Sequence, residues 1–316
     1  MASEEARIAR LRARLGVPAG AGIGVTLGIG DDAAVLEPPA GKRLVWTVDT
    51  QVEDIHFRHA WLRGPAEIGY RAFMAAASDV AAMGAEPWCA LSALELPDSF
   101  DDAALDDLAR GQRAAADRVG APIVGGNLSR GPVLAITTTL LGVAATPVTR
   151  GGAREGDGIW LAGPVGLAAA GLAALAAGVT DPRMAEAISA WRVPDARIAD
   201  GRALAGVAHA AIDVSDGLAR DLGHLAAASA VRGVLDAELL LAHAGDALVR
   251  AADALGRSPL DLILHGGEDY ALVAASASPL LGFTRVGDVR AGAGLGLRAA
   301  GGETELTPRG FDHFAP

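Results

Sequence analysis

The stretch Ala210-Ala211-Ile212-Asp213-Val214-Ser215-Asp216-Gly217-Leu218 decides the fold class. Its apolar first half predicts a strand over 210–214, and the spacing of apolar residues after it predicts a helix over 217–228. Two acids and a serine therefore lie where a strand passes into a helix, which is a common ligand position in α/β proteins. Taken alone, Ser215 or Asp216 is explained equally well as a helix N-cap.

Strands and helices alternate along the rest of the chain, which predicts an α/β (α+β) fold. In the first half we expect strands over 44–50, 88–96 and 133–143, and helices over 65–83 and 101–119. In the second half we expect strands over 159–162, 270–275 and 283–289, helices over 167–177, 184–190, 195–208 and 245–255, and a hairpin over 295–306. A polar, glycine-rich segment at 149–157 separates two domains, 1–148 and 149–316.

Composition limits the partners. The chain has 316 residues and a net charge of −11, so we expect no nucleic acid partner, because proteins that bind nucleic acid must neutralise phosphates.

The uncharged run 158–179 is interrupted by Gly163-Pro164-Val165-Gly166, which favours a strand, a loop and a helix over a membrane span. A single cysteine, Cys89, excludes a thiolate-rich zinc site and is consistent with a reducing compartment, so we expect a cytoplasmic protein.

The loop Gly28-Ile29-Gly30-Asp31-Asp32 is the first of several loops that combine glycines with acids. With Ala33 it fits a loosened dinucleotide fingerprint, but two carboxylates would repel a pyrophosphate at that place. The acids are also suitable cation ligands, since Mg²⁺ and Ca²⁺ prefer oxygen. Taken alone, the loop is better explained as an ordinary Asx turn.

Two other segments add isolated acids. In the strand 44–50, Thr47 and Asp49 share one face and point away from the more apolar face of Leu44, Trp46 and Val48. Asp79 is the one charged residue between positions 72 and 85, so it is expected to be buried or to line a cleft. A cation would satisfy it, although capping of a neighbouring loop is the simpler alternative.

Two more glycine-rich segments are predicted as loops. Residues 125–131, Gly-Gly-Asn-Leu-Ser-Arg-Gly, carry small polar groups and one arginine that suit a phosphate or a metal-bound phosphate. Residues 264–270, Leu-His-Gly-Gly-Glu-Asp-Tyr, repeat the combination of glycine with acids. Each is explained about as well as a plain turn, but several such segments in one chain favour a shared site.

Together these motifs resemble those of the thiamine-monophosphate kinase family, within the superfamily of aminoimidazole ribonucleotide synthetase. The shared motifs occur in order along nearly the whole chain: GIGDDAAV, the His56-Phe57 pair, SDVAAMGA, VGGN with SRG, the Thr149-Arg150 turn, IDVSDGL, GGEDY and the terminal GFDHF. The resemblance implies a two-domain subunit whose N-terminal mixed sheet pairs in a homodimer and whose C-terminal domain is α/β. It also implies direct transfer of the γ-phosphoryl group of ATP to thiamine monophosphate, assisted by several Mg²⁺ ions.

The resemblance also implies roles for individual residues. The implied metal ligands are Asp32, Thr47, Asp49, Asp79, Asn127, Asp213 and Asp216, with Asp31 ranked lower. The implied ATP contacts are Gly126, Asn127, Arg150 and Ser215. The implied contacts of the thiamine phosphate are His56, Glu268 and Phe311. No covalent catalytic residue is implied, because positioning and charge stabilisation drive such a transfer.

Asn127 departs from the family, which usually has Asp at this position. An amide offers one neutral oxygen in place of a carboxylate, so one metal site is expected to be weaker or differently coordinated. Two alternatives to the kinase remain: another ATP-dependent synthetase of the superfamily and, motivated by Asn127 alone, a non-catalytic protein that binds nucleotide or thiamine phosphate. A selenophosphate synthetase is disfavoured, because it needs a reactive cysteine near the N-terminus.

Overall fold

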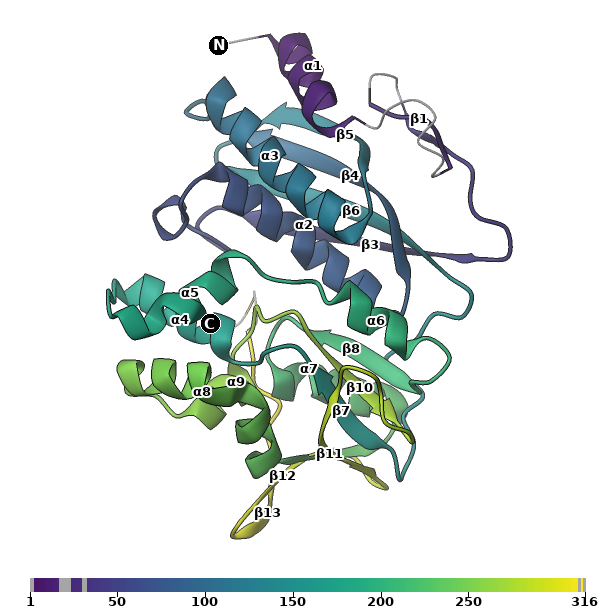
Figure 1. Cartoon of the computed structure of the whole chain (residues 1–316), viewed down its shortest axis with the longest axis vertical. Helices are drawn as coiled ribbons and strands as arrows, with labels where there is room; N and C mark the ends of the chain where they lie inside the picture. The colour runs from purple at the N-terminus through teal and green to yellow at the C-terminus, as the bar shows by residue number, and fades with distance from the viewer. Residues whose placement is uncertain (1–2, 17–23, 30–32, 312–313, 315–316) are drawn as a thin grey trace. The chain divides into compact units, whose positions relative to one another are not determined.

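The computed structural model describes residues 3–16, 24–29, 33–311 and 314. The chain divides into two compact units (Figure 1). Unit 1 comprises residues 1–80 and 86–145, and unit 2 comprises residues 81–85 and 146–316. The division at 145/146 lies close to the expected boundary at 148/149.

Unit 1 is built on a four-stranded sheet with the order β3-β6-β4-β5, in which β4 and β5 are parallel and the other neighbours antiparallel. Its strands are β3 (Arg43–Val52), β4 (Glu86–Leu96), β5 (Ile123–Arg130) and β6 (Ala135–Ala144). Its helices are α1 (Glu4–Leu15), η1 (His59–Trp61), α2 (Pro65–Ala82, whose last residues belong to unit 2) and α3 (Asp102–Val119). A short pair, β1 (Val25–Leu27) and β2 (Val35–Leu36), forms a separate ribbon.

The two faces of this sheet differ in cover. Helices α2 and α3 lie across one face (Figure 1), where Gln112 of α3 donates to the hydroxyl of Ser92 over 2.7 Å. The opposite face, here called the open face, carries Leu44, Trp46 and Val48, which are 50%, 71% and 63% exposed. The predicted alternation along this strand is therefore confirmed, but its apolar side is the exposed side.

The prediction of a loop at 125–131 is wrong for most of that segment. Strand β5 continues through it to Arg130 and pairs in parallel with β4. Gly126 has φ +156°, and a Cβ added there would overlap the carbonyl oxygen of Ser92. The glycines thus allow close approach of two strands, which is the other structural reason for glycine in such a pattern.

Unit 2 contains a seven-stranded sheet with the order β13-β12-β9-β11-β7-β10-β8. Its strands are β7 (Gly158–Ala162), β8 (Ala210–Val214), β9 (Arg232–Asp236), β10 (Ala271–Ser276), β11 (Thr284–Arg290), β12 (Gly294–Ala299) and β13 (Gly302–Glu305). Its helices are α4 (Leu167–Ala177), η2 (Pro182–Met184), α5 (Ala185–Arg192), α6 (Ile198–Leu204), α7 (Leu218–Ser229), α8 (Ala237–Leu255) and α9 (Pro259–His265). The predicted hairpin at 295–306 is confirmed, whereas β9 and α9 were not predicted and α6 is shorter than the expected helix over 195–208.

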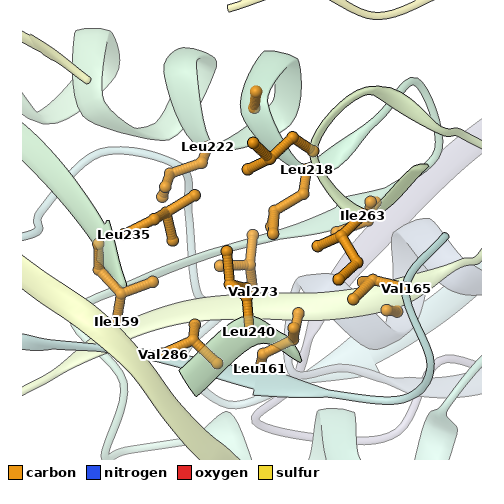
Figure 2. Packing of buried hydrophobic residues seen from close by; sticks show 14 of the residues in the cluster. Ile159, Leu161, Val165, Leu218, Leu222, Leu235, Leu240, Ile263, Val273 and Val286 are labelled. Atoms are coloured by element: carbon orange, nitrogen blue, oxygen red, sulfur yellow. The ribbon is translucent and has the colours of Figure 1, made fainter. Parts of the chain in front are cut away.

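The core of unit 2 follows the period-two alternation of its strands. Ile159, Leu161 and Val273 point to the face covered by α7, α8 and α9 (Figure 2), where they meet Leu222 and Ile263. Strand residues of the other parity, Ala211, Leu272 and Ala274, form a second cluster with Leu280 and with Leu204 of α6. A sheet covered on both faces is the α/β arrangement expected from the sequence.

The uncharged run 158–179 forms β7, a glycine loop and α4, as predicted. Among the described residues, no helix combines the length and apolarity needed to cross a membrane.

Candidate functional site

The turn Ser215–Gly217, between β8 and α7, brings together three predicted motifs of unit 2. The backbone N–H of Glu268 donates to the carbonyl oxygen of Ser215 over 2.8 Å. The backbone N–H of Phe311 donates to the carbonyl oxygen of Asp216 over 2.9 Å. An expected metal ligand and two expected substrate contacts are thereby fixed to one turn.

Asp221, which the sequence interpretation missed, holds this turn from within α7. Its Oδ2 accepts hydrogen bonds from the backbone N–H groups of Asp216 and Gly217, each over 3.1 Å. Burial, followed by the charges of Asp213 and Asp216, raises the pKa of Asp221 to about 7. A signal was present in the sequence, because Asp221 shares the helix stripe of Leu218, Leu222 and Leu225 and is the one acid there.

The two expected metal ligands of unit 2 differ in environment. Asp213 lies at the end of β8 and is 5% exposed, so its carboxylate is almost fully removed from solvent. Asp216 forms an ion pair with Arg220 over 3.5 Å, and the same guanidinium donates to the carbonyl oxygen of Phe311. Arg220 therefore links Asp216 to the C-terminal segment of unit 2.

The two acids of the GGEDY motif, Glu268 and Asp269, have different environments. Glu268 has φ +69°, and its Oε2 accepts a hydrogen bond of 2.8 Å from the indole Nε1 of Trp191. Asp269 is buried, and its carboxylate accepts from the N–H groups of Gly166 and Ala168 over 2.5 and 2.9 Å, at the start of α4. Burial raises the pKa of Asp269 to about 7. Asp269 therefore anchors the loop, and Glu268 is the acid left to act on a ligand.

Arg150 lies at the opposite end of α7 from Ser215. The hydroxyl of Ser229, the last residue of α7, donates to the carbonyl oxygen of Arg150 and accepts from the N–H of Gly152, both over 3.1 Å. The 12 residues of α7 span about 18 Å. Both residues were assigned to ATP, and at this separation they would have to contact different parts of the nucleotide.

In unit 1, Thr47 and Asp79 are in direct contact. The hydroxyl of Thr47 donates to Oδ2 of Asp79 over 2.5 Å, which joins β3 to α2. Asp49 lies on the same face, where Oδ1 accepts from the side chain of Gln51 over 3.3 Å. His56 uses Nδ1 to accept the backbone N–H of Val52 over 3.0 Å, so its Nε2 carries the proton when the ring is neutral.

Asn127 lies in a different row of the same sheet. The strand pairing puts Asn127 in line with Ala93, Thr137 and Thr50 on the open face. Gly126 falls in the neighbouring row, which contains Asp49 and faces the helices. The structure therefore separates Asn127 from Thr47, Asp49 and Asp79, while Asp31 and Asp32 lie outside the described residues.

A cavity of about 1010 Å³ lies beside the part of the unit 1 sheet that contains Asn127. Its lining includes the expected nucleotide contacts Gly126 and Asn127, together with Trp46 of the open face and Leu11 of α1. A largely apolar cavity of this size with a few polar groups is typical of small-ligand sites.

The donor groups in both units suit magnesium in kind. They are carboxylate and hydroxyl oxygens, which are the ligands that this hard cation prefers. Within the described ranges, no group of three His, Cys, Asp or Glu side chains lies close enough to hold a metal.

Comparisons with known proteins give a consistent result. The model of the AIR synthase related protein, N-terminal domain, matches residues 30–144. A thiamine-monophosphate kinase of Mycobacterium tuberculosis is 40% identical over 269 residues, which are 84% of this chain and 79% of that relative.

Solved structures resemble the chain over nearly its full length. A thiamine-monophosphate kinase from Stenotrophomonas maltophilia gives a TM-score of 0.81 at 33% identity, covering 93% of this chain and 96% of the other. AaThiL complexed with AMPPCP and TMP also gives a TM-score of 0.81, at 30% identity, covering 98% and 97%.

Proposed function

The chain belongs to the thiamine-monophosphate kinase family, and on this premise we propose that it transfers the γ-phosphoryl group of ATP to the phosphate of thiamine monophosphate. An oxygen of the acceptor phosphate forms the new bond to phosphorus, the bond to the β,γ-bridging oxygen breaks, and ADP leaves with thiamine diphosphate as product. The observation that carries the proposal is the attachment of Asp216, Glu268 and Phe311 to one turn. That AaThiL was solved with an ATP analogue and TMP supports the choice of both substrates.

The residues of unit 2 supply acceptor recognition in this proposal. Glu268 is a carboxylate and accepts hydrogen bonds only, so its contact is with the heterocyclic part of the acceptor and not with its phosphate. Phe311 is 49% exposed and offers an aromatic face to the positively charged heterocycle. Ser215, Arg150 and, in unit 1, Gly126 and His56 are proposed ligand contacts on the resemblance alone.

We propose Mg²⁺ as the cofactor, held by Thr47, Asp49 and Asp79 in unit 1 and by Asp213 and Asp216 in unit 2, with Asp32 and, on the separate row of the sheet, Asn127 as further ligands. Bound magnesium would neutralise the phosphates of the donor and the acceptor, which otherwise repel one another. The side chains fix where that charge is neutralised, and Arg220 orients one of the carboxylates.

We also propose a homodimer in which a second copy covers the open face of unit 1. Three large apolar side chains of β3 are exposed there, and an apolar patch of this kind marks an interaction surface. The reaction needs ATP, and the chain has one cysteine, so we place the protein in the cytoplasm.

Turnover with analysis of products tests the proposed function. Purified protein, ATP, thiamine monophosphate and magnesium should yield ADP and thiamine diphosphate in equal amounts, measured by chromatography. Binding of nucleotide without thiamine diphosphate would instead favour the non-catalytic alternative raised by Asn127, and a different product would favour a synthetase. Asp49→Ala should abolish turnover while the protein stays folded, and near-normal activity would contradict its role.

A further inference from the structure

Trp191 is fully buried, yet its polar atom meets the carboxylate of a predicted ligand contact. The indole Nε1 donates to Oε2 of Glu268 over 2.8 Å, although the two residues are 77 positions apart. Trp191 belongs to α5, on which the sequence placed no functional residue. With an exposure of 0%, it cannot touch a ligand and can act only through its neighbours.

The main chain of Glu268 is held as firmly as its side chain. Its φ of +69° lies in the left-handed region, which a residue with a side chain rarely adopts and which persists where the surroundings impose it. Its N–H is bound to Ser215, the next residue anchors α4, and Tyr270 donates from its N–H to the carbonyl oxygen of Val214 over 2.9 Å. Trp191 therefore completes a set of contacts that fix the direction of one carboxylate.

A buried indole needs an acceptor, and a backbone carbonyl meets that need at no electrostatic cost. Trp160 in the same unit shows this arrangement, since its Nε1 donates to the carbonyl oxygen of Ser276 over 3.1 Å. Trp191 uses a partly buried charged group in its place, and partial burial of a carboxylate is costly. Packing alone gives no reason for this choice of acceptor.

We propose that Trp191 is a positioning residue that orients the Glu268 carboxylate toward the heterocycle of the acceptor and so determines acceptor affinity. The inference rests on the proposed function and adds to it the residue that fixes acceptor recognition. Because Trp191 acts through Glu268, its loss weakens binding of the acceptor and leaves binding of ATP unchanged.

Trp191→Phe removes the donor and keeps an aromatic ring, and Trp160→Phe is the matched control in the same unit. We expect Trp191→Phe to raise the KM for thiamine monophosphate about tenfold, which corresponds to about 1.4 kcal/mol. The KM for ATP should change less than about twofold, and Trp160→Phe should leave both values near those of the unchanged protein. In a Glu268→Gln background, Trp191→Phe should add no further increase, because coupled residues are not additive.

A second measurement uses the unchanged protein, in case Trp191→Phe folds poorly. Thiamine monophosphate should alter the tryptophan emission of the unchanged protein and of Trp160→Phe. Any one of four results would overturn the inference alone. These are an unchanged KM for thiamine monophosphate in an active Trp191→Phe, an equal rise in the KM values for thiamine monophosphate and ATP, full additivity with Glu268→Gln, and a tryptophan emission that does not change when thiamine monophosphate is added. Absence of thiamine diphosphate with the unchanged protein would overturn the proposed function itself, and the inference with it.

Discussion

The hydroxyl of Thr47 lies 2.5 Å from Oδ2 of Asp79, so a strand and a helix of unit 1 present two proposed magnesium ligands at one point. Thr47→Val keeps the shape of the side chain and removes this oxygen. The lost hydrogen bond should lower the free energy of unfolding by about 1 kcal/mol. The magnesium concentration for half-maximal turnover should rise several-fold, as measured by titration of the rate with MgCl₂.

Thr50→Val is the matched control for this variant. Thr50 lies three positions further along β3 on the open face, where its hydroxyl contacts that of Thr137 over 2.9 Å. Its loss should leave the magnesium titration unchanged. Equal titrations for Thr47→Val and the unchanged protein would show that Thr47 is no ligand.

Asp221 is not a proposed ligand contact, but it accepts hydrogen bonds from the backbone N–H groups of Asp216 and Gly217. Its replacement should therefore affect both stability and activity. Asp221→Ala leaves two N–H groups without their acceptor, which should cost about 1–3 kcal/mol of stability. The turn that carries Asp216 should loosen, so the requirement for magnesium should rise together with the KM for ATP. Calorimetric melting and rate titrations check both effects, and unchanged magnesium dependence in a destabilised Asp221→Ala would limit Asp221 to a structural role.

The exposed side chain of Trp46 provides a test of the proposed homodimer. Trp46→Glu puts a charge among the exposed apolar side chains of β3 on the open face, where a second copy is proposed to bind, and desolvating that charge is costly. We expect the dimer to dissociate in analytical ultracentrifugation. Leu281→Glu, at a side chain of unit 2 that is 86% exposed, is the control and should remain dimeric. A monomeric unchanged protein would contradict the proposed dimer.

Asn127 lies in the row of the open face and lines the cavity of unit 1. Asn127→Asp restores the acid usual in the family and should reduce the magnesium concentration for half-maximal turnover several-fold, because a carboxylate binds a hard cation more strongly than an amide. Ser129→Asp adds the same charge two residues further along β5 and should not do so. Equal titrations for Asn127→Asp and the unchanged protein would exclude Asn127 from the metal site.

Local patterns were sufficient for most of the fold, and they failed where a neighbour decided the outcome. The glycines at 125 and 126 indicated a loop, and pairing with β4 made them part of a strand. Strand β9 is five residues long, and α9 seven, so neither gave a long periodic signal. The sequence did contain a local signal for the start of α9, because the capping serine Ser258 is followed by a proline.

The site shows the same limit. Residue types near Asp213 and Asp216 revealed candidate ligands, but the contact between Trp191 and Glu268 joins residues 77 positions apart and leaves no local trace. The sequence also could not show which face of β3 the helices cover. Its alternation gave two faces, and the packing of α2 against Thr47 decided which one is exposed.

The buried Asp269 predicts how stability depends on pH. Burial raises its pKa to about 7, above the usual value of 3.8. Between about pH 4 and pH 7 the native protein therefore keeps a proton that the unfolded chain has lost, and the free energy of unfolding falls as pH rises, by at most about 1.4 kcal/mol per pH unit. Asp269→Asn removes this contribution, so denaturant unfolding across that range should show a shallower decline. The exposed Asp261 provides the control, because Asp261→Asn makes the same change of charge in α9 and should keep the decline of the unchanged protein. A decline equally steep in Asp269→Asn would contradict a protonated Asp269 in the native state.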